Sequence, residues 1–183
     1  EFARTLGVED GNLEKMRADV RANLEREVAQ RLRARNKAAV MQALPAIATF
    51  ELPTALVEGE SEQLAERATE DLKSRGIDPA NVPFPPDAFK ADAERRVRLG
   101  LIVAELVKEH DLKAKPDQIR KQIEEFAASY ESPAEVVRYY FSDRGRIAEV
   151  EGIVLEQNVV DWVTANAKVT ERALNLEELM GGA

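Results

Sequence analysis

The sequence has no cysteine, only one histidine and few aromatic residues among its 183 positions. Without cysteine the chain cannot form disulfide bonds or thiolate-ligated metal sites. No apolar run approaches the roughly 20 residues that a membrane-spanning helix requires. The chain begins at Glu1 without an initiator methionine and without the basic and apolar segments of a signal peptide. We therefore expect a cytoplasmic protein, and we expect this chain to be an excised piece of a longer one.

The usual components of a catalytic site are also missing. Catalysis needs a nucleophile beside a base, two carboxylates in a concave site, or metal ligands at suitable spacing. The single histidine, His110, ends a predicted helix, where the helix dipole favours a partial positive charge. We therefore expect no catalytic residue, no metal site and no cofactor. The acidic residues that could in principle gather are assigned to solvated helix faces: Glu124, Glu125, Glu149, Glu151, Glu177 and Glu178.

Acidic residues outnumber basic ones. The 34 Asp and Glu residues against 26 Lys and Arg residues give a formal net charge of -8. Such a surface opposes binding to the phosphates of nucleic acid or to an anionic membrane. The sequence therefore predicts neither a nucleic-acid partner nor a membrane partner.

Long uninterrupted stretches of Ala, Leu, Glu and Arg favour helices. The first predicted helix runs from Asn12, which suits an N-cap, to about Leu44, where Pro45 ends or kinks it. At about 1.5 Å per residue this helix would be on the order of 50 Å long. Its apolar stripe is narrow and predicts a strut covered on one side only. The stripe consists of Leu13, Met16, Val20, Leu24, Val28 and Leu32.

A helical hairpin follows. Pro53 suits the first turn of a helix that runs to about Arg75, and Gly76 closes it. The connection from Ile77 to Asp87 contains four of the eight prolines, so a stiff extended loop is predicted there. A third helix is predicted from about Pro86 to His110. The four prolines are Pro79, Pro83, Pro85 and Pro86.

The rest of the chain starts new helices in a similar way. Helices are predicted from Pro116 to Tyr130, from Pro133 to Phe141 with Ser132 as its cap, and from about Arg146 to Lys168. A break is expected from Asp143 to Gly145. Residues 169–183 lack periodicity and predict an extended tail. The tail is expected to dock four apolar side chains: Val169, Leu174, Leu176 and Leu179.

Half of the aromatic residues gather between positions 126 and 141. Because neighbours on a helix point about 100° apart, one ring of the adjacent Tyr139 and Tyr140 can pack inward while the other faces solvent. Two interpretations stay open at this point. The rings fill a core between short helices, or they form an exposed apolar patch that marks a binding site. The cluster consists of Phe126, Tyr130, Tyr139, Tyr140 and Phe141.

Several blocks, in this order and spacing, resemble the C-terminal domain of bacterial trigger factor. The resemblance covers essentially the whole chain and is more specific than any one short motif. The blocks are Gly7-Val8-Glu9-Asp10-Gly11 with the run from Leu13 to Arg21, Glu94 to Leu101, Ala128 to Val137, Ala167 to Glu171, and Glu177 to Met180.

The resemblance implies an all-α fold: an elongated helical body built on a long helix, two helical arms that form a cradle, and an extended C-terminal tail. Residues 1–48 would form the long linking helix, 49–112 the first arm, 113–145 the second arm, and 146–183 the closing helix and tail. The ribosome-docking and prolyl-isomerase regions of the family precede this domain and are not found in this sequence. Ribosome binding is therefore expected only through an N-terminal domain outside this chain.

The resemblance also implies a function: ATP-independent holding of nascent or unfolded polypeptides by dispersed apolar patches, which prevents their aggregation. Family substrate contacts match Phe126, Tyr130, Val136 and Tyr139, to which we add Tyr140. Candidates on the first arm suit the hairpin core equally well: Leu56, Leu64, Phe84, Phe89 and Leu101. The alternatives are a periplasmic chaperone core of the SurA type and a helical scaffold or oligomerisation module. Self-association is left open.

Overall fold

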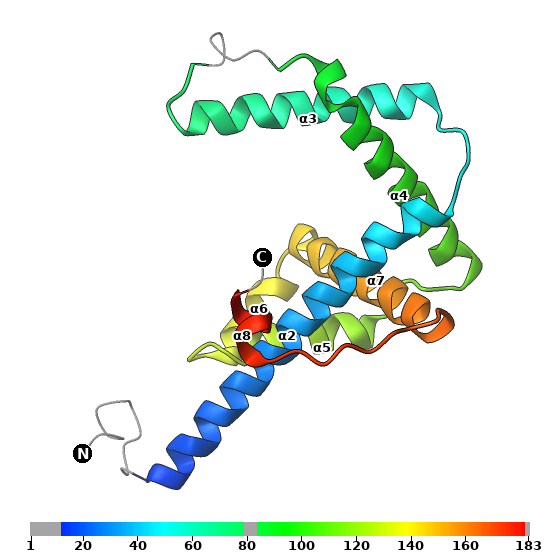
Figure 1. Ribbon diagram of the computed structural model, residues 1–183. Coiled ribbons are helices and arrows are strands. Elements are labelled where there is room, and N and C mark those ends of the chain that lie inside the picture. Colours follow the sequence, from blue (N-terminus) through cyan, green and yellow to red (C-terminus); the bar gives the residue numbers. More distant parts are fainter. Residues whose placement is uncertain (1–11, 79–83, 182–183) are drawn as a thin grey trace. The chain divides into compact units, whose positions relative to one another are not determined.

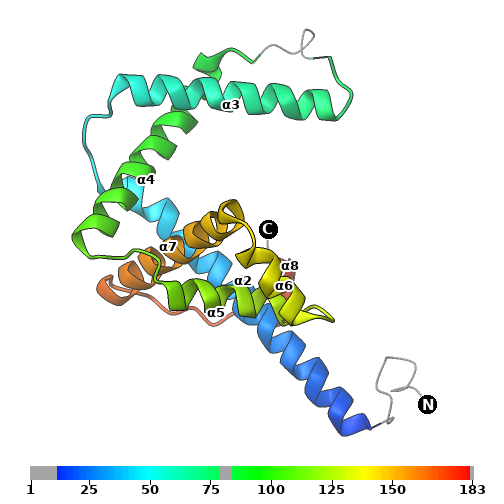
Figure 2. The same cartoon turned by 180° about the vertical axis from the view of Figure 1, so that it is seen from behind.

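The computed structural model describes residues 12–78 and 84–181, and both stretches consist of helices and connections without a strand. The chain divides into two compact units, one formed by residues 1–39 with 168–183 and the other by residues 40–167. Figures 1 and 2 show the helices of both units. The all-α class expected from the sequence is confirmed. The positions of Gly7, Gly11, Pro79 and Pro83 lie outside the described residues.

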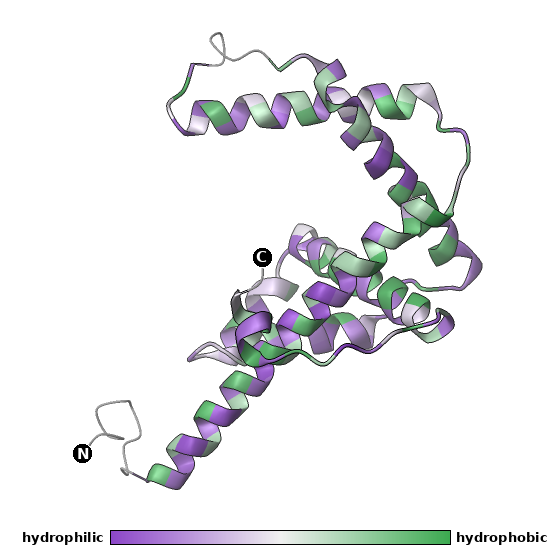
Figure 3. Cartoon of the chain, viewed as in Figure 1, coloured by the Kyte–Doolittle hydropathy of each residue, from purple (hydrophilic) through white to green (hydrophobic). Residues whose placement is uncertain are grey.

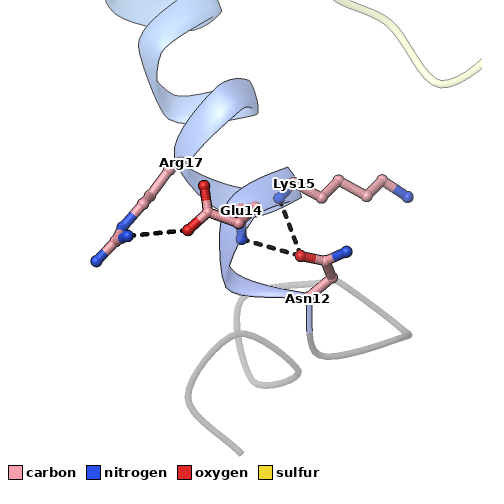
Figure 4. Close-up of polar contacts among 4 residues, drawn as sticks. All are labelled: Asn12, Glu14, Lys15 and Arg17. Carbon is pink, nitrogen blue, oxygen red and sulfur yellow. Dashed lines mark hydrogen bonds and ion pairs between the residues drawn. The ribbon is translucent and has the colours of Figure 1, made fainter.

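Helix α2 (Leu13–Ile47) begins at the predicted cap. The Oδ1 atom of Asn12 accepts hydrogen bonds from the backbone N–H groups of Glu14 at 2.9 Å and Lys15 at 3.3 Å (Figure 4). Glu14 also forms an ion pair with Arg17 at 3.1 Å, one turn further on. At the other end, the helix passes through Pro45 and stops at Ile47, so the prediction that it ends near Leu44 was too short. Proline has a φ angle compatible with a helix, and its missing N–H removes one hydrogen bond near the end of α2 without stopping the helix at Leu44.

The cap of α2 gives a first test. Replacing Asn12 by Ala removes the acceptor of two N–H groups and is expected to destabilise the first turn by about 1 kcal/mol. Amide hydrogen exchange at Glu14 and Lys15 should accelerate accordingly. An Asn12→Asp variant retains an acceptor oxygen and serves as the control. Unchanged exchange in the Ala variant would contradict this account of the helix start.

The apolar stripe of α2 corrects one expectation. Leu13, Val20, Leu24 and Leu32 remain 55%, 47%, 44% and 40% exposed, and Leu44 is the buried residue of this helix. The stripe lines a shallow groove of about 980 Å³ together with Leu176 of the C-terminal segment. Figure 3 shows its apolar positions as green bands between purple polar ones. The prediction of a covered side was wrong over most of the stripe, because periodicity marks an apolar face without supplying its partner.

Helix α3 (Thr54–Ser74) packs against the short 3-10 helix η2 (Pro86–Phe89) and against α4 (Lys90–Glu109). Gly76 closes α3 as predicted, with a φ of 74°, and the N–H of Ile77 donates to the carbonyl of Leu72 at 3.0 Å. One continuous helix was predicted from Pro86, but the structure begins there with the 3-10 helix η2, and α4 starts only at Lys90. Small side chains allow α3 and α4 to approach closely. The buried residues of these two helices are Val57, Ser61, Ala65 and Ala93.

Helices α5 (Pro116–Ala127), α6 (Pro133–Phe141) and α7 (Arg144–Asn166) pack on one another around a small core. Helix α5 ends three residues before the predicted Tyr130. The carbonyl of Ser132, and not its hydroxyl, accepts the first bonds of α6. Helix α7 begins two residues before the predicted Arg146, because Asp143 accepts the N–H of Arg146 at 3.0 Å and acts as the N-cap. The core residues are Ile119, Ile123, Val150 and Val154.

The C-terminal segment is not wholly extended as predicted, because helix α8 (Leu176–Gly181) ends it. Asn175 and Glu178 form a capping box: Asn175 Oδ1 accepts the N–H of Glu178 at 2.7 Å, and Glu178 Oε2 accepts the N–H of Asn175 at 3.3 Å. Leu179 is buried and Leu174 is half-buried, whereas Val169 and Leu176 stay 56% and 52% exposed. The prediction that all four apolar side chains of the tail dock was therefore wrong for Val169 and Leu176.

Candidate functional site

The aromatic cluster lies on helices α5 and α6 and on the turn between them. Phe126 and Tyr140 are half-buried, pack against the core of α5 and α7, and have ring centroids 6.3 Å apart. The ring of Tyr139 meets Tyr140 edge-on, at 5.9 Å and 86°. The adjacent tyrosines therefore divide as the helical geometry suggested, with Tyr140 turned inward and Tyr139 outward.

Three rings of the cluster face solvent. Tyr130, in the turn after α5, is 61% exposed, Tyr139 is 56% exposed, and Phe141, at the end of α6, is 41% exposed. Val136, three positions before Tyr139 on α6, is half-buried. We use the name aromatic surface for these three exposed residues, Tyr130, Tyr139 and Phe141; Tyr139 and Phe141 lie two positions apart on α6 and therefore point to opposite sides of that helix. Of the three rings, Tyr139 contacts the half-buried Tyr140, which itself packs against the core of α5 and α7.

Two arginines from the neighbouring helices contact this surface. Cζ of Arg146, on α7, lies 3.6 Å from the centroid of the Tyr139 ring, a cation–π distance. Its Nη1 atom also donates to the carbonyl of Tyr139 at 2.8 Å and to the hydroxyl of Ser142 at 3.2 Å. Cζ of Arg120, on α5, lies 5.5 Å from the centroid of the Phe141 ring. The contacts of these two arginines could not be predicted from the sequence, since they depend on how α5, α6 and α7 pack.

The first-arm candidates do not join into one patch. Leu56 is 48% exposed, whereas Leu64, Phe84, Phe89 and Leu101 are half-buried. Leu56 and Leu101 line the same shallow hollow, of about 410 Å³, on α3 and α4. Phe84 packs against Phe89 with centroids 5.8 Å apart and lines a different hollow.

His110 has a structural environment. It is the C-cap residue of α4, at the predicted end of this helix, and its backbone N–H donates to the carbonyl of Leu106 at 3.0 Å. Its ring stacks on Trp162 of α7, with centroids 4.0 Å apart. The six carboxylates singled out from the sequence are all exposed. Within residues 12–78 and 84–181, no group of three His, Cys, Asp or Glu residues is placed to hold a metal ion.

Comparison with known proteins decides the family. The family model described as bacterial trigger factor protein C-terminus matches residues 12–165. The chain belongs to the trigger factor family. A trigger factor from Herminiimonas arsenicoxydans is 55% identical over 181 residues, which cover 99% of this chain and 40% of the relative. A trigger factor from Acidovorax sp. strain JS42 is 54% identical over 184 residues, covering 100% of this chain and 42% of the relative.

The chain thus spans about two-fifths of the length of these trigger factors. The family model that matches is the one for the C-terminus of trigger factor. No helix in the described parts has both the length and the apolar character needed to cross a membrane.

Proposed function

We propose that this domain acts as an ATP-independent chaperone, holding unfolded or nascent polypeptides at the aromatic surface. The observation that carries the proposal is the exposure of Tyr130 and Tyr139, of which Tyr139 contacts a Tyr140 ring that packs on the core. Aromatic side chains with one face free offer large contact areas at low entropic cost. Family membership supports the choice of unfolded chains as the ligand. The competing hypothesis is a helical scaffold, whose ligand would be one folded partner protein.

The mechanism follows from weak, repeated contacts. Covering one apolar side chain of a client contributes about 1.5 to 3 kcal/mol, and much of this is offset by the cost of association. One patch therefore binds weakly and releases quickly. Further contacts at Leu56 of the first arm would raise the affinity through effective concentration, without any need for nucleotide. We further propose that contact with the ribosome is made by regions outside this chain. Self-association of the domain is compatible with the same function.

Truncating the two most exposed tyrosines tests this site. We expect a Tyr130→Ala/Tyr139→Ala variant to bind an unfolded client about tenfold more weakly, since two rings lose their contact area. NMR titration with a permanently unfolded client measures the affinity and locates the shifts on α5 and α6.

The matched control is an Ile47→Ala/Val169→Ala variant, which removes two side chains that are 78% and 56% exposed elsewhere. It should bind like the unaltered chain. Normal binding by the tyrosine variant would overturn the site. Failure to bind or to protect three unrelated unfolded clients would overturn the chaperone function and favour a scaffold.

A further inference from the structure

A positively charged side chain lies against the aromatic surface, although the three residues of that surface are themselves uncharged. The guanidinium of Arg146 lies against one face of the exposed Tyr139 ring, 3.6 Å from its centroid. The ring of Tyr140 lies nearly perpendicular to that of Tyr139, with centroids 5.9 Å apart, and 56% of Tyr139 is still exposed. With Arg146 against one face, the exposed remainder of the Tyr139 ring is what is left for a ligand.

The position of Arg146 is fixed by more than the stacking. Its Nη1 donates to the Tyr139 carbonyl at 2.8 Å and to the Ser142 hydroxyl at 3.2 Å, and its backbone N–H binds Asp143 at the start of α7. The Tyr139 carbonyl and the Ser142 hydroxyl are neutral acceptors, so neither of these two bonds brings a negative charge to the guanidinium. Arg146 thus holds the Tyr139 ring in one orientation and places a cation directly behind it.

We propose that Arg146 sets the specificity of the aromatic surface, so that Tyr139 accepts neutral apolar side chains of a client and discriminates against lysine and arginine. This inference rests on the proposed polypeptide-holding function. A bare tyrosine face attracts cations through its quadrupole. With Arg146 already against the ring, a second cation that approaches its exposed part meets a like charge only about the width of the ring away.

A second pair repeats the arrangement. Arg120 of α5 lies over the ring of Phe141, 5.5 Å from its centroid, and Phe141 is also partly exposed. Two exposed rings of α6 are therefore backed by arginines from the two helices that flank it. The same selection against cationic side chains extends to this second ring, although at a longer distance.

The test compares two short, unstructured peptides built on Ser and Gly with two fixed leucines. The residue between the leucines is norleucine in one peptide and lysine in the other, so that the aliphatic stems match and a charge is the main difference. The measured quantity is the ratio of the two affinities, obtained by NMR titration while observing the Tyr139 ring. Circular dichroism confirms that each variant is folded.

Arg146→Gln removes the charge but keeps an amide donor for the neighbouring oxygens, and it should lower the preference for norleucine roughly threefold or more. Arg146→Lys keeps the charge and should retain the preference of the unaltered chain. Arg144→Met removes the same net charge from a position outside the stacked pair, so it corrects for the general field of the domain and should leave the ratio nearly unchanged.

An Arg146→Gln variant with an unaltered ratio would overturn the inference, as would an Arg146→Lys variant that behaves like Arg146→Gln. A failure of the proposed function looks different. In that case neither peptide binds, or both bind equally well to a Tyr139→Ala variant.

Discussion

An Ile123→Ala variant is expected to lose about 2 to 5 kcal/mol of its free energy of unfolding, among the largest effects of any single substitution in this domain. Ile123 is 0% exposed and lies in the core that joins α5 to α7, with Val150 and Val154. Truncation removes apolar contacts and leaves a cavity that the surrounding helices fill only in part. Phe126 and Tyr140 rest on the same core, so the aromatic surface should lose its support as well.

Chemical denaturation followed by circular dichroism measures this loss. The control is Ile153→Ala on α7, where the same side chain is 43% exposed, and its cost should be well below that of Ile123→Ala. Equal losses in the two variants would show that the small core does not hold these helices together.

Replacing Asn158 by Leu is expected to cost about 2 to 4 kcal/mol, although the two side chains have similar volumes. The Nδ2 atom of Asn158 donates to the carbonyls of Leu112 at 3.1 Å and Lys113 at 3.3 Å. Its Oδ1 atom accepts from Nε2 of Gln118 at 2.8 Å. One amide therefore ties the connection between α4 and α5 to α7. Leucine would leave these partly buried polar groups without a partner, which costs more than the lost bonds alone.

Urea denaturation gives the stability change, and amide exchange in the connection between α4 and α5 should report local opening. Asn166→Leu is the control, because the amide of Asn166 makes a local bond to the carbonyl of Trp162 and is exposed. A stable Asn158→Leu variant with a protected connection would contradict the role assigned to this amide.

Helix ends were predictable where one side chain or one backbone angle decides them. Asn12 accepts two N–H groups of the first turn, and Gly76 takes the positive φ that few other residues adopt. The C-terminal α8 was missed although its signal was present. An Asn followed three residues later by Glu is a capping-box pattern, and Asn175 with Glu178 forms that box.

The orientation of the two adjacent tyrosines was predictable, whereas the charged groups beside them were not. Adjacent tyrosines on a helix must diverge, so one inward and one outward ring follow from the sequence. The stacking of Arg146 on Tyr139 does not follow, because it needs the turn from Ser142 to Asp143 to fold α7 back toward α6. The open stripe of α2 shows a similar limit, since a periodic pattern identifies an apolar face and not its partner.

The packing of α5, α6 and α7 has a kinetic consequence. Each of these helices contacts the next along the chain, and their shared core is drawn from within 36 residues, Ile119 to Val154. Contacts this local in sequence close quickly, so this part of the domain should fold on the microsecond-to-millisecond timescale of small helical bundles. A domain proposed to receive unfolded chains would thus complete its own aromatic surface early, with little time spent as an aggregation-prone chain itself.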